Sequence, residues 1–221
     1  MILRVEARGV HNVPRDGALI IAISHSSWID PVVLGPNIPR YIASMAKAEV
    51  AEWPILGGIV RAYGAFFVRR GAADVGAFKI GLQVLKLGYA MGIAPEGHRS
   101  ETGKLQRGRE GAIILALRSG APILPVAVWG GKWLWKNLAH LRRTEMKLFI
   151  GAPVRIVALN GKASREVIAE LSDELMMLIA RLMPPELHGY YEGKLREPKY
   201  LKPIQVTQEE KEVVKTVVSQ Q

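Results

Sequence analysis

Residues 18–31 of the chain read ALIIAISHSSWIDP and join an apolar run to a polar turn that carries a histidine and an aspartate. The run at 18–23 is short, rich in isoleucine and bounded by polar residues, which is typical of a buried strand. Asp30 followed by Pro31 indicates the start of a helix. The stretch therefore predicts a strand, a turn and a helix in succession, with His25 at the carboxyl end of the strand.

The rest of the chain repeats this alternation. Four further strand-like apolar runs lie at 61–68, 90–94, 123–129 and 146–150, and helical patterns cover 75–85, 110–118 and 164–183. Strands alternating with helices predict an α/β fold, a single-domain sandwich whose largely parallel central sheet is flanked by helices. We expect this domain to span residues 1–200. Residues 201–221 are expected to form a polar tail, in which Thr207 and Glu210 could cap a short helix.

The composition favours an anionic partner. The 221 residues carry a formal net charge of +10, which suits nucleic acid, an acidic membrane surface or phosphorylated substrates. The absence of cysteine excludes disulfides and thiolate chemistry. Residues 1–8 are charged and strand-like, without a signal-peptide pattern, and no uncharged run reaches the roughly 18 to 20 residues of a spanning helix. A lipid-directed protein of this composition is expected to sit on the membrane rather than cross it.

His25 and Asp30 are the first candidate catalytic pair. A turn between them would let the carboxylate accept a hydrogen bond from one imidazole nitrogen, which leaves the other nitrogen free to take a proton from an alcohol. That alcohol would belong to the substrate, because no serine lies in a Gly-x-Ser-x-Gly elbow. The alternative is that His25 is a half-buried residue at a strand end and that Asp30 only caps the following helix.

A second polar loop follows the run at 90–94 and reads PEGHRS over residues 95–100. It is expected to open onto the same edge of the sheet as His25. Arg99 offers a planar fork for phosphate oxygens, and Gly97 allows close approach of the backbone. The alternative is an ordinary turn with Arg99 in solvent. The spacing from Gly97 to Lys104 does not match a nucleotide-binding P-loop.

The run at 61–68 ends in Arg69 and Arg70. Successive strand residues point to opposite faces, so only one of the two can face the crevice at the strand ends. An arginine there suits a lipid phosphate, and the alternative is a strand-end charge in solvent.

Taken together, these segments resemble the 1-acylglycerol-3-phosphate acyltransferases of the glycerolipid acyltransferase superfamily. Four blocks match the family's motifs in order: the His-x4-Asp box at 25–30, GAFFVRR at 64–70, PEGHRS at 95–100 and APILPV at 121–126. Residues 46–49, AKAE, also lie where members often carry Lys-x-Glu. The resemblance covers roughly residues 5 to 155 and implies a glycerol-3-phosphate acyltransferase-like fold.

The resemblance also implies roles for the residues. His25 would be the general base and Asp30 its orienting partner. The acceptor, a lysophospholipid such as lysophosphatidic acid acylated at its sn-2 hydroxyl, would be bound through its phosphate. The substrate-binding residues implied are Lys47, Arg70, Glu96, Gly97, Arg99 and Arg109. The acyl donor would be acyl-CoA or acyl-acyl carrier protein, and no metal or other cofactor is expected.

Three departures from the family pattern lie in the phosphate-binding segments. Arg69 replaces an aspartate, His98 replaces a threonine, and Gly108-Arg109 stands where Phe-Lys is common. They leave open a related acyltransferase that acts on another lysolipid. A binding module without activity, a further alternative suggested by the charge, lacks an aromatic-basic nucleic-acid motif, so no nucleic-acid partner is expected.

A peripheral place on the cytoplasmic face of an anionic membrane is expected for such an enzyme. The candidate contact is residues 129–136, WGGKWLWK, where three tryptophans alternate with two lysines and are followed by Arg142, Arg143 and Lys147. Aromatic rings beside cations suit the headgroup layer. The alternative is that the tryptophans pack in the core beneath a basic surface.

Overall fold

The computed structural model describes residues 3–47, 58, 65–68, 73–157 and 163–205. Within them, nine strands form one sheet with the order β1-β7-β6-β2-β5-β3-β4, extended by β8 on β6 and β9 on β8. The strands are β1 Leu3–Arg8, β2 Leu19–Ile23, β3 Ile42–Lys47, β4 Ala65–Val68, β5 Ala90–Ile93, β6 Ile123–Trp129, β7 Thr144–Ile150, β8 Val154–Ile156 and β9 Leu201–Pro203.

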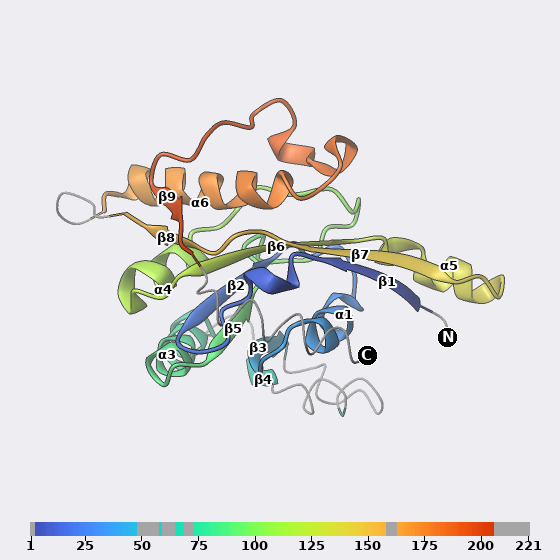
Figure 1. Cartoon of the computed structure of the whole chain (residues 1–221), viewed down its shortest axis with the longest axis horizontal. Helices are drawn as coiled ribbons and strands as arrows, with labels where there is room; N and C mark the ends of the chain where they lie inside the picture. Colours follow the sequence, from blue (N-terminus) through green and yellow to red (C-terminus); the bar gives the residue numbers. More distant parts are fainter. Residues whose placement is uncertain (1–2, 48–57, 59–64, 69–72, 158–162, 206–221) are drawn as a thin grey trace.

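The helices cover the sheet on both sides, and Figure 1 shows α6 and α1 on opposite faces of it. They are α1 Asp30–Asn37, α3 Ala73–Lys86, α4 Gly111–Ser119, α5 Leu134–Ala139 and α6 Arg165–Ala180, with short 3-10 turns η1 Val10–Asn12, η3 Gly131–Trp133, η4 Pro185–Leu187 and η5 Gly189–Tyr191. Along the main path of the sheet, only β6 and β7 pair antiparallel. The expected largely parallel α/β sandwich is confirmed.

The central strand β2 explains why the sheet carries two helical layers. All five of its residues are buried, and successive side chains point to opposite faces. Ile20 and Ala22 join the core cluster under α3, α4 and α6, whereas Leu19, Ile21 and Ile23 join the cluster under α1. A strand buried on both faces needs a continuous apolar run, which is what residues 18–23 supply.

The other predicted elements also form. The runs at 90–94, 123–129 and 146–150 contain β5, β6 and most of β7, and the described part of 61–68 is β4. The helical patterns correspond to α3, α4 and α6, and Gly120 ends α4 in the left-handed conformation. The segment Leu201–Pro203, assigned to the polar tail by the sequence, forms β9 because its backbone pairs with β8. Thr207 and Glu210 lie outside the described residues.

A buried carboxylate holds this last strand in place. Glu174 on α6 is 1% exposed and accepts hydrogen bonds from the backbone N–H groups of Lys199, Tyr200 and Leu201 at 2.6 to 3.2 Å. A charged acceptor in the interior is tolerated only when donors surround it in this way. Glu174 therefore ties the end of the described chain to α6.

Replacing Glu174 by alanine is expected to lower the free energy of unfolding by about 3 kcal/mol, because three backbone donors lose a charged acceptor. Urea denaturation followed by circular dichroism measures this. Glu197→Ala is the matched control: Glu197 is largely exposed and, among the described residues, pairs with Arg181 alone at 2.8 Å, so its loss should cost less than about 1 kcal/mol. Equal effects of the two substitutions would contradict the structural role of Glu174.

Candidate active site

The sheet brings the two polar loops of the sequence together. Strands β2 and β5 are parallel neighbours, so the turn after Ile23 and the loop after Ile93 leave the same edge of the sheet. A hydrogen bond of 2.8 Å from the Ser100 backbone N–H to the His25 carbonyl joins them. The shared edge that the sequence predicts is confirmed.

His25 and Asp30 face each other within the turn. His25 Nδ1 lies 3.0 Å from Asp30 Oδ2, the imidazole is 30% exposed and the carboxyl group is 1% exposed. A carboxylate can only accept, so the proton of the neutral ring lies on Nδ1 and Nε2 is left as the acceptor. Nε2 makes no hydrogen bond to any residue that the structure describes. It is therefore the ring nitrogen left to accept a proton from a substrate hydroxyl.

The local backbone explains how Asp30 is held. Its Oδ2 atom also accepts from the backbone N–H groups of Ser26 and Ser27 at 2.8 and 2.7 Å. Asp30 is the first residue of α1, and the residue before it provides no side-chain cap. Its carboxylate points back into the turn toward His25 as well as standing at the start of α1. The other carboxylate oxygen, Oδ1, is buried and has no hydrogen-bond partner among the residues that the structure describes.

Glu96 connects the histidine turn to the second loop. Its carboxyl group is 1% exposed; Oε1 accepts from the His25 backbone N–H at 2.9 Å and Oε2 accepts from the Gln106 backbone N–H at 3.0 Å. Burial raises the pKa of this carboxyl group, against the lowering effect of those hydrogen bonds. Glu96 thus fixes the position of His25 through the backbone and does not touch the imidazole in the hydrogen bonds described. Sequence reasoning missed Gln106 as its partner.

Glu96→Gln should therefore lower activity by roughly tenfold or more, because an amide cannot accept from both backbone donors with both of its atoms. It should also have a pH signature. The raised pKa means that the folded protein binds this proton more readily than the unfolded chain, so this contribution to stability is present at low pH and is lost as the pH rises through the raised value. Urea denaturation across this range should show the stability advantage of wild type over Glu96→Gln shrinking with rising pH. A growing advantage would contradict the assignment.

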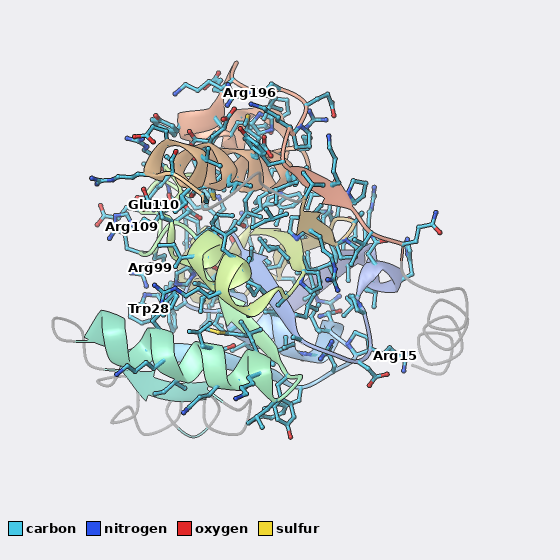
Figure 2. The ribbon with its side chains drawn as sticks, turned by 90° about the vertical axis from the view of Figure 1, so that its left-hand side faces the viewer. Arg15, Trp28, Arg99, Arg109, Glu110 and Arg196 are labelled. Atoms are coloured by element: carbon cyan, nitrogen blue, oxygen red, sulfur yellow. The ribbon has the colours of Figure 1, made fainter. Side chains whose placement is uncertain are left out.

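Arg99 stacks on the ring of Trp28, which belongs to the turn between His25 and Asp30. Its guanidinium carbon is 4.1 Å from the centroid of Trp28, which is itself 45% exposed. Figure 2 shows Trp28, Arg99 and Arg109 along the same side of the molecule. A stacked guanidinium keeps its edge available for the oxygens of an anion. Trp28 lies inside the His-x4-Asp box, but its role as the support of Arg99 is visible only in the structure.

Gly97 and Arg109 are in contact across the loop. Gly97 has a φ of +77°, and a Cβ atom there would lie 2.6 Å from Arg109 Cδ. The backbone beside Arg109 is anchored by α6 and η5: Ser172 Oγ donates to the Arg109 carbonyl at 3.0 Å, and the Gly108 N–H donates to Tyr191 Oη at 3.0 Å. The glycine therefore makes room for the arginine, which brings a second guanidinium to this side of the molecule.

The structure describes the other predicted site residues only in part or not at all. The backbone of Lys47 ends β3, beside Val68 of β4, and its side chain lies outside the described part. Arg69 and Arg70 lie outside the described residues. The structure thus brings together His25, Asp30, Glu96, Gly97, Arg99 and Arg109 from the set that the sequence predicts.

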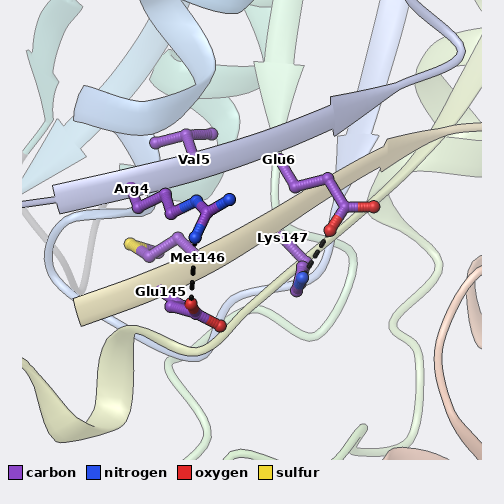
Figure 3. Close-up of a pocket in the computed structure, with 6 residues that line it drawn as sticks. All are labelled: Arg4, Val5, Glu6, Glu145, Met146 and Lys147. Carbon is purple, nitrogen blue, oxygen red and sulfur yellow. Dashed lines mark hydrogen bonds and ion pairs between the residues drawn. The ribbon is translucent and has the colours of Figure 1, made fainter. Parts of the chain in front are cut away.

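A separate hollow lies between β1 and β7, away from this site (Figure 3). It is lined by Arg4, Val5, Glu6, Glu145, Met146 and Lys147. Its charges pair with one another, Arg4 with Glu145 at 3.8 Å and Lys147 with Glu6. Opposite charges that satisfy each other leave little for a ligand, so we do not assign this hollow a function.

Comparisons with known proteins identify the family of the chain. A family model described as acyltransferase matches residues 4–129, and the chain belongs to this acyltransferase family. The 1-acyl-sn-glycerol-3-phosphate acyltransferase of Bacillus subtilis (strain 168) is 33% identical over 80% of this chain and 87% of its own length. The 1-acyl-sn-glycerophosphate acyltransferase PlsC of Thermotoga maritima superposes with a TM-score of 0.59 at 26% identity, over 89% of this chain and 75% of that one. The chain is accordingly an O-acyltransferase, as the motif resemblance indicates.

Another similar protein is named for a different acceptor lipid. The lyso-ornithine lipid O-acyltransferase of Pseudomonas aeruginosa is 32% identical over 57% of this chain and 48% of its own length.

Proposed function

We propose that this enzyme transfers a fatty acyl group from acyl-CoA or acyl-acyl carrier protein to the sn-2 hydroxyl of lysophosphatidic acid, which gives phosphatidic acid. The single observation that carries the chemistry is the 3.0 Å contact between His25 Nδ1 and the buried Asp30 carboxylate. The names of the relatives support the acceptor.

The pair suits direct attack of the acceptor on the thioester. His25 Nε2 takes the proton of the acceptor hydroxyl as the hydroxyl oxygen bonds to the carbonyl carbon. Asp30 stabilises the imidazolium that forms. Collapse of the tetrahedral intermediate breaks the carbon–sulfur bond, and the leaving thiolate recovers the proton from the imidazolium. No enzyme nucleophile is needed, in keeping with a chain that has no cysteine.

The acceptor phosphate is proposed to bind between the guanidinium groups of Arg99 and Arg109. Both lie on the same side of the molecule as Trp28, and Arg fork geometry matches phosphate oxygens. Lys47 and Arg70 are proposed as further phosphate ligands from the motif resemblance. Glu96 and Gly97 act on this site indirectly, the first by holding His25 and the second by admitting Arg109. The proposed reaction requires no metal or other cofactor.

The acceptor lipid implies work at a membrane. Within the described residues, every helix is too short or too polar to span a bilayer. We propose peripheral attachment to the cytoplasmic face of an anionic membrane, supported by the net charge of +10.

An acceptor screen tests the function. Purified enzyme is incubated with acyl-CoA, or separately with acyl-acyl carrier protein, and with lysophosphatidic acid, lysophosphatidylcholine or lyso-ornithine lipid. Product is followed by mass spectrometry. We expect lysophosphatidic acid to be the preferred acceptor, and monoacylglycerol, which lacks the phosphate, to be acylated poorly. The similarity to a lyso-ornithine lipid O-acyltransferase makes that lipid the second candidate, and its preference in the screen would replace our proposal.

A further inference from the structure

The turn η3 and helix α5, together with the turn into β7, form a projection that we call the spur, residues 131–143. Figure 1 shows α5 at one end of the long axis of the molecule. The helix buries none of its residues, although its sequence is LWKNLA. Trp133 and Trp135 are 53% and 71% exposed, and Leu138 is also exposed. The alternative that these two tryptophans pack in the core is wrong; Trp129 alone of the three is partly buried, against Phe149.

The spur is cationic as well as apolar. It contains Lys132, Lys136, Arg142 and Arg143 and no acidic residue. The ammonium groups of Lys132 and Lys136 lie 5.8 and 5.4 Å from the centroid of the Trp133 ring. Lys147, by contrast, is ion-paired with Glu6 and does not add to this surface. Within the described residues none of these four cations has an acidic partner, and exposed aromatic rings between such cations match the headgroup layer of an anionic bilayer.

Leu141, in the turn that follows α5, has an unusual backbone conformation and an exposed side chain. Leu141 is 96% exposed and has a φ of +54°, in the left-handed region that glycine or asparagine normally occupies. A leucine there is strained in the backbone and exposes its whole side chain to water, so neither packing nor local conformation explains it. Insertion of the side chain into a bilayer would explain its exposure.

The spur is also fixed to the active site. A Cβ atom at Gly131 would lie 2.6 Å from Ser27 Cβ, so the start of the spur packs directly against the His-x4-Asp turn. Lys132 Nζ donates to the carbonyl of Thr102, which follows the loop of Arg99, at 3.3 Å. Asn137 Nδ2 donates to the buried Thr144 hydroxyl at 3.1 Å and holds α5 on β7. Whatever the spur binds is therefore held at a constant position relative to His25.

We propose that the spur is the membrane-docking element of this enzyme: Trp133, Trp135, Leu138 and Leu141 enter the interface of an anionic bilayer, while the four cations contact lipid headgroups. Docking in this way would place the turn that carries His25 next to the bilayer surface. This inference deepens the proposed function, because a lysolipid acceptor resides in that surface.

Vesicle co-sedimentation without any substrate tests the inference independently of catalysis. Wild type should bind phosphatidylcholine–phosphatidylglycerol vesicles much more strongly than phosphatidylcholine vesicles, and less strongly in about 1 M salt. The double variant Trp133→Ala/Trp135→Ala should lose at least about tenfold in affinity. Arg142→Gln/Arg143→Gln should lose roughly 25-fold on the anionic vesicles, at about fivefold per basic residue. The control Leu87→Ala/Tyr89→Ala removes exposed apolar side chains at the entrance to β5 and should bind as wild type.

Leu141→Gly separates docking from folding. It should raise the Tm by roughly 1 to 4 °C, because the left-handed strain is removed, and yet weaken vesicle binding. Unchanged binding by the tryptophan and arginine variants would overturn the proposal. So would a wild-type dimer in size-exclusion chromatography that the tryptophan variant converts to monomer, since a second copy would then occupy the spur. Vesicle binding through the spur by an enzyme that acylates no lysolipid would instead overturn the proposed function and leave this inference standing.

Discussion

Replacing His25 by alanine is expected to reduce the turnover of acyl-CoA with lysophosphatidic acid by at least about 100- to 10,000-fold, the range that a general base supplies. The loss should appear in kcat, because the proton is transferred in the transition state and the imidazole is not needed to hold the phosphate. Release of free CoA, followed with a thiol reagent, measures the rate continuously in a protein that has no thiol of its own.

His11→Ala is the matched control for this experiment. His11 is exposed on η1 and lies outside the site, so its loss should leave the rate unchanged. The melting temperature of His25→Ala should stay within a few degrees of wild type, since the ring is partly exposed and makes one described hydrogen bond. A rate within a few-fold of wild type in a folded His25→Ala protein would remove His25 from the mechanism.

The parts of the fold that the sequence could predict are those in which local pattern and burial agree. The strand at 18–23 is buried on both faces, so every position is apolar and the pattern is unambiguous. Gly120 marks the end of α4 because its left-handed conformation excludes most other residues. The sequence pattern does not predict β3, β8 and β9. Strands β8 and β9 have only three residues each, and all three strands depend on pairing with neighbours that are distant in the sequence.

In the site, too, local contacts follow from the sequence and contacts between separate loops do not. His25 and Asp30 are five residues apart and are joined by a local turn, so their contact follows from the spacing. The support of Arg99 by Trp28 and the contact of Arg109 with Gly97 depend on how separate loops pack, which spacing does not encode. Gln106 donates to the Glu96 carboxylate, and the Tyr191 hydroxyl accepts from the Gly108 N–H. No motif identifies such partners in advance.

The tryptophans of residues 129–135 illustrate why composition alone is ambiguous. Trp129 lies at the end of β6 and contacts Phe149 with ring centroids 4.9 Å apart, as a partly buried residue does. Trp133 and Trp135 follow after Gly130 and Gly131, which turn the chain away from the sheet. Both glycines lie where a Cβ atom would strike neighbouring atoms, Glu145 at Gly130 and Ser27 at Gly131. Trp133 and Trp135 are exposed because of this turn, although tryptophan side chains are usually buried.

Asp30→Asn is expected to lower kcat by roughly 100- to 1,000-fold while the protein stays folded. The asparagine oxygen can take the place of Oδ2 and accept from the backbone N–H groups of Ser26 and Ser27, so the turn is retained. What is lost is the negative charge that stabilises the imidazolium of His25. Kinetics with lysophosphatidic acid and thermal unfolding of the same preparation measure the two effects separately, and Asp16→Asn on the surface serves as the control.

Asp30→Ala makes the argument complete, because it removes the acceptor as well as the charge. Two backbone donors are then left without their partner beside a buried space, which should lower the free energy of unfolding by about 2 to 3 kcal/mol in addition to the loss of activity. The pair of variants therefore distinguishes the electrostatic role of Asp30 from its role in shaping the turn. If Asp30→Asn kept the full rate, or lost its rate only in proportion to unfolding, the carboxylate would be a structural residue of the turn and His25 would act without its charge.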